Sequence, residues 1–373
     1  MSRMTKLDIA IIGGGSAGMT LARNLSSSDT SLVTKVFEPK TPTQRDCCWS
    51  FWSTDEHCTQ ITESTKGHWK QWRLVDEYGE VVLGNGRFGY TCLSSAKYLQ
   101  SCEDSLSGCV SLTRSKVDSV ERQAAGGEIS VGDDRYQALK IYDSRPSQHS
   151  EQGLRQHFVG WEIKTSKPLS NTDMATLMDF RVDQSRGLHF IYALPFSDDH
   201  LLIESTMISQ KIEDKQWYQD AMTSWLKSQG IAIAELVREE VGVIPMEQVT
   251  KSEDGLQTIG GSSGAIRLSS GYGFSSIQSQ MHELAMNLSE GNDQVPQSMS
   301  TALIRMDKIF NNVLLSRPDL SKEIFMRTAR ALDGDEFARF MLGSASIKEW
   351  LKVILSMPKA PFIKQLWNEV VRG

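Results

Sequence analysis

The sequence predicts an α/β fold in which a nucleotide-binding domain carries an inserted mixed β-sheet and is followed by a helical C-terminal part. Two strand–glycine-turn–helix segments, one at the start of the chain and one near residue 260, indicate the nucleotide-binding domain. Strand patterns rich in bulky and β-branched residues lie between them. A length of 373 residues allows two domains or one large two-part domain. We expect a discontinuous nucleotide-binding domain (1–75, 137–155 and 240–296), an inserted region (76–136 and 156–239) and a helical part (297–373).

The first segment, "KLDIAIIGGGSAGMTLARNL", is a short apolar strand, a glycine turn and a helix. Gly13 permits the tight turn, Gly15 leaves room for a pyrophosphate, and Gly18 lets the helix pack on the strand. The next strand, "LVTKVFEP", ends in Glu38, where an acid would bind a ribose hydroxyl. This motif predicts a dinucleotide site but does not choose between FAD and a nicotinamide nucleotide. Its contact residues are Gly13, Gly15, Ser16, Ala17, Gly18 and Glu38.

Two later segments favour FAD. The first, "IYDSRP" (141–146), is a strand that ends at Asp143 and returns the chain to the nucleotide domain; the alternative is an ordinary strand-end turn. The second, residues 256–289, has a glycine loop, then a helix from about Tyr272, which together would receive the flavin ribityl chain and ring. Its predicted contacts are Gly261, Gly264, Ser270, Gly271 and Tyr272.

The inserted region contains a predicted β-hairpin, residues 187–209, in which two apolar runs flank the turn "SDD". Glu204 lies within the second run. A buried carboxylate is costly unless it is paired, protonated or used in chemistry. The strand pattern alone favours a salt-bridged or edge-exposed residue for Glu204.

Composition narrows the class of protein. The formal net charge of -6 argues against broad nucleic-acid binding. The seven histidines lack HExxH spacing, so we expect no metal site. The segment "GSSG" lacks the GxSxG nucleophile elbow, which argues against a nucleophilic serine there. We expect no signal peptide, since "LDIAIIGGG" begins almost at once, and no apolar run is long enough to span a bilayer. Reduced thiols are expected for the cysteines, which are Cys47, Cys48, Cys58, Cys92, Cys102 and Cys109.

Several motifs together resemble the lycopene cyclases of the bacterial β-cyclase type, flavoproteins of carotenoid biosynthesis. They are "GGGSAG", "CWSFW" (48–52), "IYDSRP", "QHFVGWEI" (156–163), "LMDFRVDQ" (177–184), "FIYALPFSDDHLLIEST" (190–206) and "SSGYGF" (269–274). The run from 156 to 206 is the most specific. Two departures occur: residues 268–272 read "LSSGY" where a "PSTGY"-like stretch is expected, and residues 260–261 read "GG" where flavin hydroxylases have "GD".

The resemblance implies a Rossmann-like FAD-binding domain of the FAD-dependent hydroxylase type. It implies that Glu204 is the catalytic acid in cyclising lycopene to β-carotene, an intramolecular lyase reaction without net redox change. Asp179 would orient Glu204 or bind near the flavin; the alternative is a strand-end hydrogen-bonding aspartate. FAD would act in its reduced form, with NADPH or NADH as electron donor. The aromatic candidates for the substrate site, which equally suit core packing, are Trp49, Phe51, Trp52, Trp161, Phe180 and Tyr192.

Two other classes of function stay open on the residues alone: a flavin- and NADPH-dependent hydroxylase or prenyl-chain reductase, and a flavin-binding protein without catalysis. Consumption of dioxygen or NADPH in step with product would mark the redox enzymes.

The last 27 residues carry two apolar helical faces with lysines nearby, separated by Pro358. Such helices suit a membrane interface; the alternative is packing on the protein's own core. With an acyclic C40 substrate we expect peripheral contact with the inner face of a bacterial cytoplasmic membrane. The apolar faces comprise Ile347, Trp350, Leu351, Ile354, Phe362, Ile363, Leu366, Trp367, Val370 and Val371; the basic residues are Lys348, Lys352, Lys359, Lys364 and Arg372.

Overall fold

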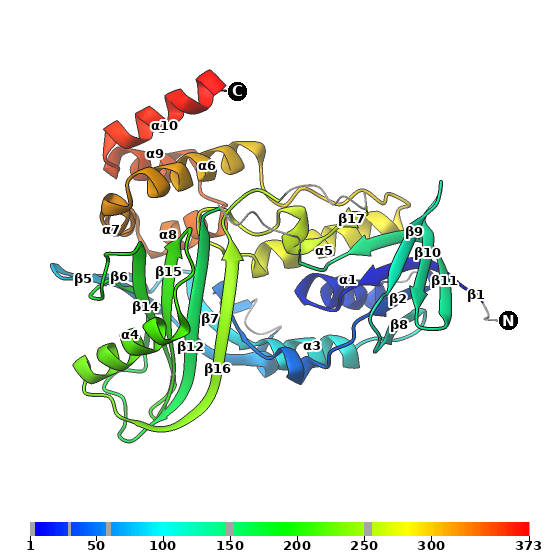
Figure 1. Ribbon diagram of the computed structural model, residues 1–373, viewed down its shortest axis with the longest axis horizontal. Coiled ribbons are helices and arrows are strands. Elements are labelled where there is room, and N and C mark those ends of the chain that lie inside the picture. Colours follow the sequence, from blue (N-terminus) through cyan, green and yellow to red (C-terminus); the bar gives the residue numbers. More distant parts are fainter. Residues whose placement is uncertain (1–3, 29–30, 57–60, 147–152, 250–255, 373) are drawn as a thin grey trace.

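Two seven-stranded sheets lie at opposite ends of an elongated molecule, with a layer of helices against one of them (Figure 1). The structure is a computed structural model that describes residues 4–28, 31–56, 61–146, 153–249 and 256–372; of residues 369–372 it describes the backbone only.

The first sheet has the strand order β8-β2-β1-β11-β10-β9, with β17 paired to β11. The central strand β1 runs parallel to β2 and to β11, so that Ile12 lies beside Phe37 on one side and Asp143 on the other. The segment "IYDSRP" therefore does return the chain to the nucleotide-binding sheet, as predicted. The strands are β1 (Met4–Ile12), β2 (Thr34–Phe37), β8 (Val110–Thr113), β9 (Ser119–Arg122), β10 (Gly127–Val131), β11 (Asp134–Asp143) and β17 (Gln257–Thr258).

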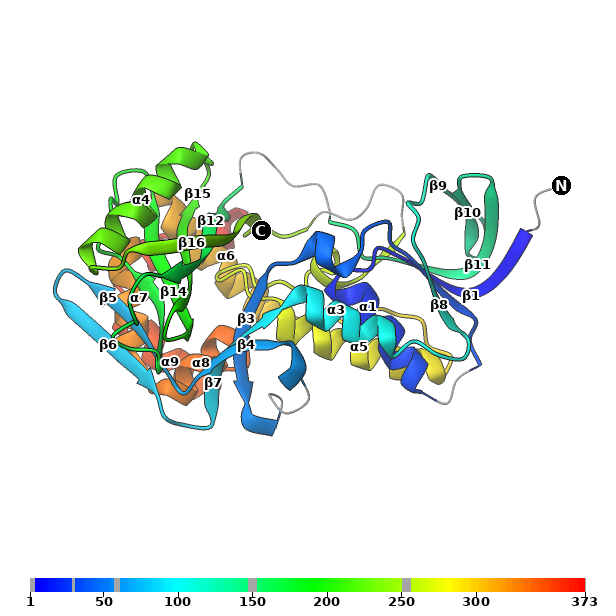
Figure 2. The same cartoon turned by 90° about the horizontal axis from the view of Figure 1, so that it is seen from below.

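Three helices pack together against this sheet (Figure 2). They are α1 (Ser16–Ser27), α3 (Ser95–Asp104) and α5 (Phe274–Ser289). Their apolar residues form one buried cluster with Ile9, Ile11 and Val36 of the sheet. Helix α5 begins two residues after the predicted start at Tyr272. The short 3₁₀ helices η1 (Pro42–Arg45), η2 (Thr62–Ser64) and η3 (Gly260–Ser263) join these elements.

The second sheet is mixed and has the order β16-β12-β15-β14-β13-β5-β6, in which only β13 and β5 are parallel. The predicted hairpin is confirmed as β14 and β15, which turn at Asp198–Asp199. Helix α4 (Lys215–Ser228) covers one face of the sheet, and the other face looks toward the nucleotide domain (Figure 1). The strands are β5 (Gln71–Asp76), β6 (Gly79–Gly84), β12 (Arg155–Thr165), β13 (Met174–Asp179), β14 (Leu188–Ser197), β15 (His200–Ser209) and β16 (Ile233–Pro245).

A three-stranded sheet, β3-β7-β4, lies between the two large sheets (Figure 2). Its strands are β3 (Cys48–Thr54), β4 (Thr65–Trp69) and β7 (Phe88–Ser94). The cysteines that the structure describes are free thiols, as predicted, and Cys58 lies outside the described residues.

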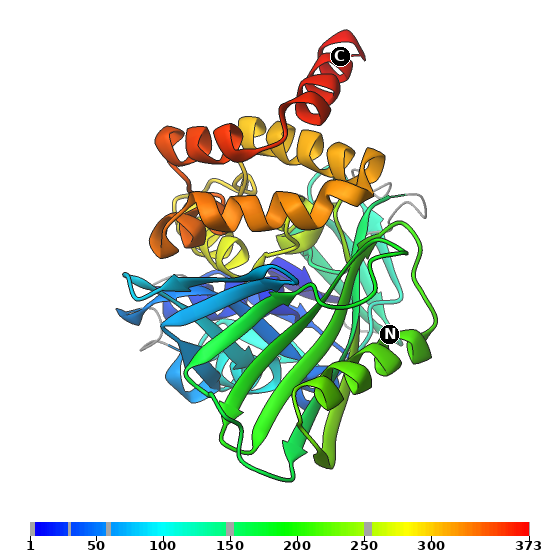
Figure 3. The ribbon, with the colours of Figure 1, turned by 90° about the vertical axis from the view of Figure 1, so that its left-hand side faces the viewer.

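The C-terminal part is helical, as predicted, and forms a layer over one end of the second sheet (Figure 3). The side chains of Ser300, Asp333 and Ser346 cap the N-termini of α6, α8 and α9, and Gly343 ends α8 in the left-handed conformation. Among the residues described, no helix combines the length and apolar character needed to cross a bilayer. The helices are α6 (Thr301–Ser316), η4 (Pro318–Leu320), α7 (Ser321–Ala331), α8 (Gly334–Leu342), α9 (Ile347–Ser356) and α10 (Lys359–Arg372).

The strand pairing differs from the predicted domain division in two places. Strands β8, β9 and β10 belong to the first sheet, although residues 76–136 were assigned to the inserted region. Strand β5 and the end of β16 belong to the second sheet, although 71–75 and 240–245 were assigned to the nucleotide domain. Strands β8, β5 and β16 join their sheets through β2, β13 and β12, which are distant in the sequence, so local patterns do not reveal these pairings. Strands β9 and β10 instead join the first sheet through consecutive hairpins with β11.

Candidate active site

A cavity of about 300 Å³ lies between the glycine turns of the nucleotide domain and the second sheet. Ser16 and the segment Ser270–Phe274 line it from the nucleotide side. The sheet contributes mostly apolar side chains and one carboxyl group. The sheet residues are Gln156, Phe158, Leu177, Met178, Phe190, Tyr192, Glu204, Thr206 and Ile244.

The N-terminal glycine turn has the backbone geometry that a phosphate site requires. Gly13 has a φ of +94°, and a Cβ on Gly18 would lie 2.0 Å from the Gly13 carbonyl oxygen. A Cβ on Gly15 would meet nothing within 4 Å, so the space in front of the turn is open. Gly15 and Gly273 cap α1 and α5 without a side-chain hydrogen bond. Both helix N-termini therefore keep free N–H groups near the cavity.

Glu38 and Arg45 complete this turn. The Glu38 carboxylate accepts hydrogen bonds of 2.8 Å from the Gly14 and Lys40 amides. Arg45 donates through Nη1 to the Gly14 carbonyl oxygen at 2.6 Å, while its buried Nε and Nη2 have no hydrogen-bond partner among the described residues. Unsatisfied buried guanidinium donors beside an open glycine turn suit the phosphates of a dinucleotide. The residues present therefore fit such a cofactor.

The other predicted cofactor residues divide into two groups. Ser270, Gly271 and Tyr272 line the cavity together with Ser16. The loop Gly260–Gly264 instead packs on α1, because the missing side chain of Gly260 makes room for Ala17.

Asp143 is also engaged within the protein. Its carboxylate binds Arg145 through two oxygens, at 2.6 Å for the shortest contact, and the neighbouring Ser144 hydroxyl contacts the Gly13 carbonyl oxygen. A direct role for Asp143 at the cofactor is therefore not supported by its contacts.

Glu204 projects into the cavity from β15. On β12, which lies between β15 and β16, Gly160 pairs with Glu204 on one side and with Glu240 of β16 on the other. A Cβ on Gly160 would lie 2.8 Å from Glu204 Cγ and 3.2 Å from Glu240 Cγ. The glycine thus leaves the room in which the Glu204 and Glu240 carboxyl groups meet and form a hydrogen bond. Burial, and then the charge of Glu240, raise the pKa of Glu204 well above its ordinary value, so this carboxyl group holds its proton.

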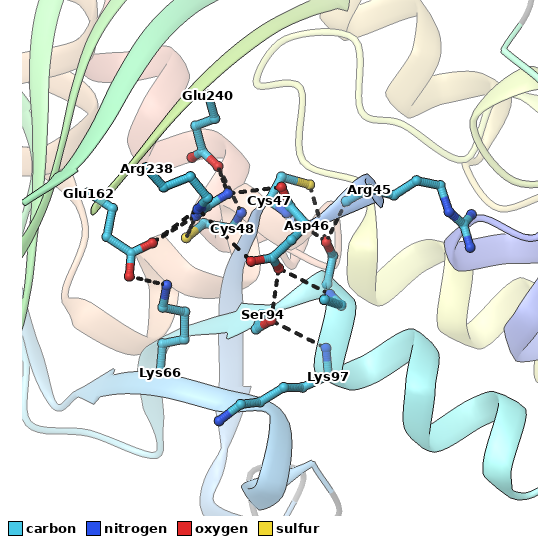
Figure 4. Close-up of polar contacts among 12 residues, drawn as sticks. Arg45, Asp46, Cys47, Cys48, Lys66, Ser94, Lys97, Glu162, Arg238 and Glu240 are labelled. Atoms are coloured by element: carbon cyan, nitrogen blue, oxygen red, sulfur yellow. Dashed lines mark hydrogen bonds and ion pairs between the residues drawn. The ribbon is translucent and has the colours of Figure 1, made fainter. Parts of the chain in front are cut away.

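Arg238 forms an ion pair with Glu240 (Figure 4). Its Nη1 lies 2.8 Å from Glu240 Oε2, and its Nη2 lies 2.9 Å from Glu162 Oε2. The Cys48 amide also donates to Glu240, at 3.1 Å. Lys66 and His200 contact the other oxygen of Glu162, at 2.6 and 2.8 Å. Glu240 is thus ion-paired with Arg238, whereas Glu204 has a raised pKa.

Three tyrosines stand beside Glu204. Tyr192, its cross-strand neighbour, donates to Tyr90, and Tyr90 is hydrogen-bonded to Tyr272, with oxygen–oxygen distances of 2.9 Å in both cases. Burial raises the pKa of all three phenols, so they remain neutral.

The predicted aromatic residues are only partly brought together. Trp49 and Tyr192 line the cavity. Phe51 stacks on Phe274 behind the wall, with centroids 4.5 Å apart, and Trp52 lies edge-on to Tyr90 and Tyr272 in the core. Phe180 packs against Phe190 and Phe325. None of Phe51, Trp52 and Phe180 lines this cavity.

Trp161 and Asp179 correct the prediction most clearly, because both face α4 on the opposite side of the sheet. The Trp161 indole donates to Glu239, and the Asp179 carboxylate accepts from Arg181 and from Trp225 of α4. Side chains alternate along a strand, so Trp161, one residue after Gly160, points away from Glu204. Although burial opposes it, these hydrogen bonds hold the pKa of Asp179 below its ordinary value. Asp179 is therefore an ion-paired core residue.

Glu240, Arg238 and Gly160 were not predicted. A glycine inside the strand "QHFVGWEI" signals close approach of neighbouring groups, and the charges in "LVREEVG" are unusual for a strand. Neither signal identifies the partner, because β12 and β16 are separated by nearly 70 residues.

Solved structures share the overall fold. A geranylgeranyl bacteriochlorophyll reductase-like protein from Thermoplasma acidophilum aligns with a TM-score of 0.64 at 14% identity, over 98% of this chain and 100% of that one. A flavoprotein/dehydrogenase from Cytophaga hutchinsonii aligns with a TM-score of 0.61 at 14% identity, over 94% of this chain and 99% of that one. These alignments confirm the predicted Rossmann-like architecture of flavin-dependent enzymes.

Sequence relatives carry the predicted family name. A lycopene beta-cyclase of Paracoccus sp. (strain N81106 / MBIC 01143) is 38% identical over 33% of this chain and 32% of its own length. A lycopene beta-cyclase of Pseudescherichia vulneris is 25% identical over 64% of this chain and 61% of its own length. A chloroplastic lycopene beta cyclase of Arabidopsis thaliana is 24% identical over 73% of this chain and 58% of its own length. The matches span less than two thirds of each relative's own length. The profile described as "Lycopene cyclase protein" matches residues 8–366. The chain therefore belongs to the lycopene cyclase family.

Proposed function

We propose that this protein cyclises the ψ-end groups of lycopene to β-ionone rings, giving β-carotene by way of γ-carotene. The observation that carries the proposal is the Glu204 carboxyl group, which is kept protonated beside Glu240 in a cavity that also faces the nucleotide-binding turns. Protonating an alkene needs an acid that still carries its proton in a dry pocket, and Glu204 is such a group.

Glu204 would start the reaction by giving its proton to C2 of the terminal C1=C2 bond. The resulting cation at C1 is attacked by the C5=C6 bond, and a C1–C6 bond closes the ring. Loss of the C6 proton then leaves the C5=C6 double bond of the β-ring. The Glu204 carboxylate, already in the cavity, is the base that takes this proton, so the enzyme returns to its starting state without net redox change.

The apolar side chains around Glu204 would exclude water, which would otherwise trap the cation as an alcohol. Phe158, Leu177 and Phe190 form this wall, and the faces of Trp49 and Tyr192 can stabilise positive charge.

We further propose that FAD binds at the glycine turn, with Glu38 at its ribose and Arg45 at its phosphates, and with its ring near Ser270–Tyr272. When bound in its reduced form, with electrons from NADPH or NADH, FAD would supply negative charge beside the cation. The free N–H groups at the start of α1 and α5 would favour that anionic form.

The test is anaerobic conversion of lycopene with reduced FAD, in H₂O and in D₂O. The product should have the mass of lycopene in H₂O and gain one deuterium for each ring formed in D₂O, because the carboxyl proton of Glu204 exchanges with solvent. Oxidised FAD alone should give no conversion. A product two hydrogens heavier would instead identify a prenyl-chain reductase, and one with added oxygen a hydroxylase.

We also propose that α9 and α10 place the protein on the inner face of a bacterial cytoplasmic membrane. Of the predicted apolar faces, Trp350 and Phe362 pack inward, together with Val353 and Met357. The side chains of Val370, Val371 and Arg372 lie outside the described residues. Large apolar side chains on the outer surface of these two helices support membrane contact. They are Ile347, Leu351, Ile354, Leu355, Ile363, Leu366 and Trp367.

Reversing two lysines tests this contact. Lys352 binds Glu336, and Lys359 donates to carbonyl oxygens at the end of α9, so Lys348 and Lys364 are the exposed lysines to change. Lys348→Glu with Lys364→Glu should weaken binding to anionic vesicles by about tenfold or more at low salt. The matched control, Lys167→Glu with Lys227→Glu on the far side, makes the same change in net charge and should bind normally. Equal binding by both double variants would contradict the proposal.

A further inference from the structure

A second cavity, of about 370 Å³, lies among the C-terminal helices α6 to α10. Its walls are almost wholly aromatic and aliphatic. The side chains that form most of the wall include Phe310, Phe340, Trp350, Val353, Met357 and Phe362. Nothing in the proposed chemistry at Glu204 uses these residues.

Two of the three charged residues that line this cavity form an ion pair, and the third, Lys359, donates to carbonyl oxygens at the end of α9. Arg267 and Asp307 are both 2% exposed and form an ion pair, with Nε and Oδ2 3.3 Å apart. The Arg267 guanidinium also lies over the Phe340 and Trp350 rings, 4.8 and 5.9 Å from their centroids. The wall is therefore predominantly apolar and suits a hydrocarbon.

The second cavity meets the first at Ser270, which lines both. At its other end it opens to the surface between α9 and α10. Ile354, Ile363 and Leu366 line the cavity and are also 50%, 63% and 48% exposed. Apolar walls thus extend from the surface proposed to touch the membrane to Ser270, which also lines the cavity of Glu204.

Size identifies what would occupy this path. Ligand pockets of about 300 to 1,000 Å³ bury drug-sized molecules. The cavity at Glu204 is at the lower limit of that range, so it can hold one end group but not a whole C40 chain. The rest of the substrate is a long, uncharged polyene, and the adjoining cavity has the matching chemistry and its own exit to the apolar surface.

We propose that the cavity between α6 and α10 is the binding site for the polyene chain behind the reacting end group, and the passage by which that chain enters. The proposal rests on the proposed function in one respect: the ligand is taken to be an acyclic C40 hydrocarbon. The burial of its apolar surface would supply most of the binding free energy, and the site at Glu204 would then act on whichever end group enters first.

A volume-filling variant tests the passage. Val353 is buried in α9 and lines the cavity, whereas Val82 of β6 is 40% exposed and lines neither cavity. Val353→Phe should lower kcat/KM for lycopene at least tenfold with parental FAD content and thermal unfolding. The matched variant Val82→Phe should stay within about twofold of the parent. Parental kcat/KM in a folded Val353→Phe protein would overturn the proposal.

A binding measurement serves even if turnover is absent or Val353→Phe does not fold. Ile309 lines the cavity from α6 and is half-buried. In Ile309→Cys, lycopene in detergent micelles should slow modification of the new thiol by methyl methanethiosulfonate at least fivefold, read by peptide mass spectrometry. Ile347→Cys, at a position that is 82% exposed and outside the cavity, should react equally with and without lycopene. Failure of lycopene to protect the thiol in Ile309→Cys would overturn the proposal, whereas protection without cyclisation would leave it standing and refute the proposed reaction instead.

Discussion

The two faces of the second sheet each hold a carboxyl group that is withdrawn from bulk water, and the two groups have opposite charge states. On the face under α4, Asp179 is fully buried and receives hydrogen bonds from Arg181 and Trp225, which hold its pKa below the ordinary value. On the cavity face, Glu204 meets a second carboxyl, Glu240, and its pKa is raised. The comparison teaches that burial alone does not decide the charge of a carboxyl group; the partner does.

Removing the acid from the cavity face should have the largest effect. Glu204→Gln keeps size and polarity but cannot give a proton to an alkene, so we expect turnover to fall by about two to four orders of magnitude or more. Anaerobic conversion of lycopene with reduced FAD measures this, with FAD content and circular dichroism as controls for folding. Near-parental turnover in this variant would mean that the acid lies elsewhere.

Changing the partner of Glu204 should alter the pH dependence of the reaction. Glu204 must be protonated to act, so kcat/KM falls as the pH rises through its pKa. The charged and titratable groups around it are Glu240, Arg238, Cys48, Tyr192 and Tyr272.

In Glu240→Gln the negative charge is lost and Arg238 loses an anionic partner, so the pKa of Glu204 should drop. The alkaline limb of the kcat/KM profile should move to lower pH, with about a tenfold loss near neutral pH. Glu239→Gln is the matched control, because this adjacent residue faces α4 and binds Trp161 and Gln219. If both variants kept the parental alkaline limb, Glu240 would have no influence on the acid.

The space left by Gly160 gives a third, smaller effect. In Gly160→Ala the new methyl group would press on Glu204 Cγ and Glu240 Cγ and separate the two carboxyl groups. We expect a loss of roughly threefold to tenfold in kcat, since a small displacement of a catalytic group is costly. Gly242→Ala, in which the methyl group would press on the Phe158 ring instead, separates this effect from a general effect of alanine in the sheet. Equal losses in both variants would argue against a special role for the carboxyl pair.

Asp179 should matter for stability and hardly for catalysis. Asp179→Asn should lower the free energy of unfolding by about 1–3 kcal/mol, because the amide cannot replace the ion pair with Arg181, whereas kcat should change less than threefold. Denaturant unfolding and lycopene conversion on the same preparation measure the two quantities. A large loss of kcat with little loss of stability would return Asp179 to the active site.

The two carboxyl groups should also make the free energy of unfolding depend on pH with opposite signs. The stabilisation that Asp179 contributes is present above its unfolded pKa, near 3.8, and is lost as the pH falls through its lower folded pKa. Glu204 does the reverse: its contribution is present below its unfolded pKa, near 4.5, and is lost as the pH rises toward the raised folded pKa. Asp179→Asn should therefore flatten the acid side of a stability profile, and Glu204→Gln the neutral to alkaline side. Unfolding free energies measured from pH 3 to pH 9 decide this.

Local pattern in the sequence was sufficient for several features. The glycine turn with Glu38 predicted the start of the nucleotide domain, and the two apolar runs that flank the turn "SDD" predicted the hairpin β14–β15. The apolar helical faces separated by Pro358 predicted the last two helices. These features depend on residues close together in the chain, where turn geometry, side-chain period and capping act directly.

Only the tertiary structure decided which groups surround Glu204. Gly160 and Glu240 reach it by strand pairing between segments 36 to 44 residues away, and Arg238 comes with Glu240 on the same strand. The same pairing turned Trp161 and Asp179 toward α4, although both lie in motifs that resemble the family. Strand register sets the face of every side chain, and register depends on partners distant in sequence. The family resemblance in the sequence therefore singled out Glu204 as the proposed acid, while the partner proposed to keep it protonated emerged only when the sheet was assembled.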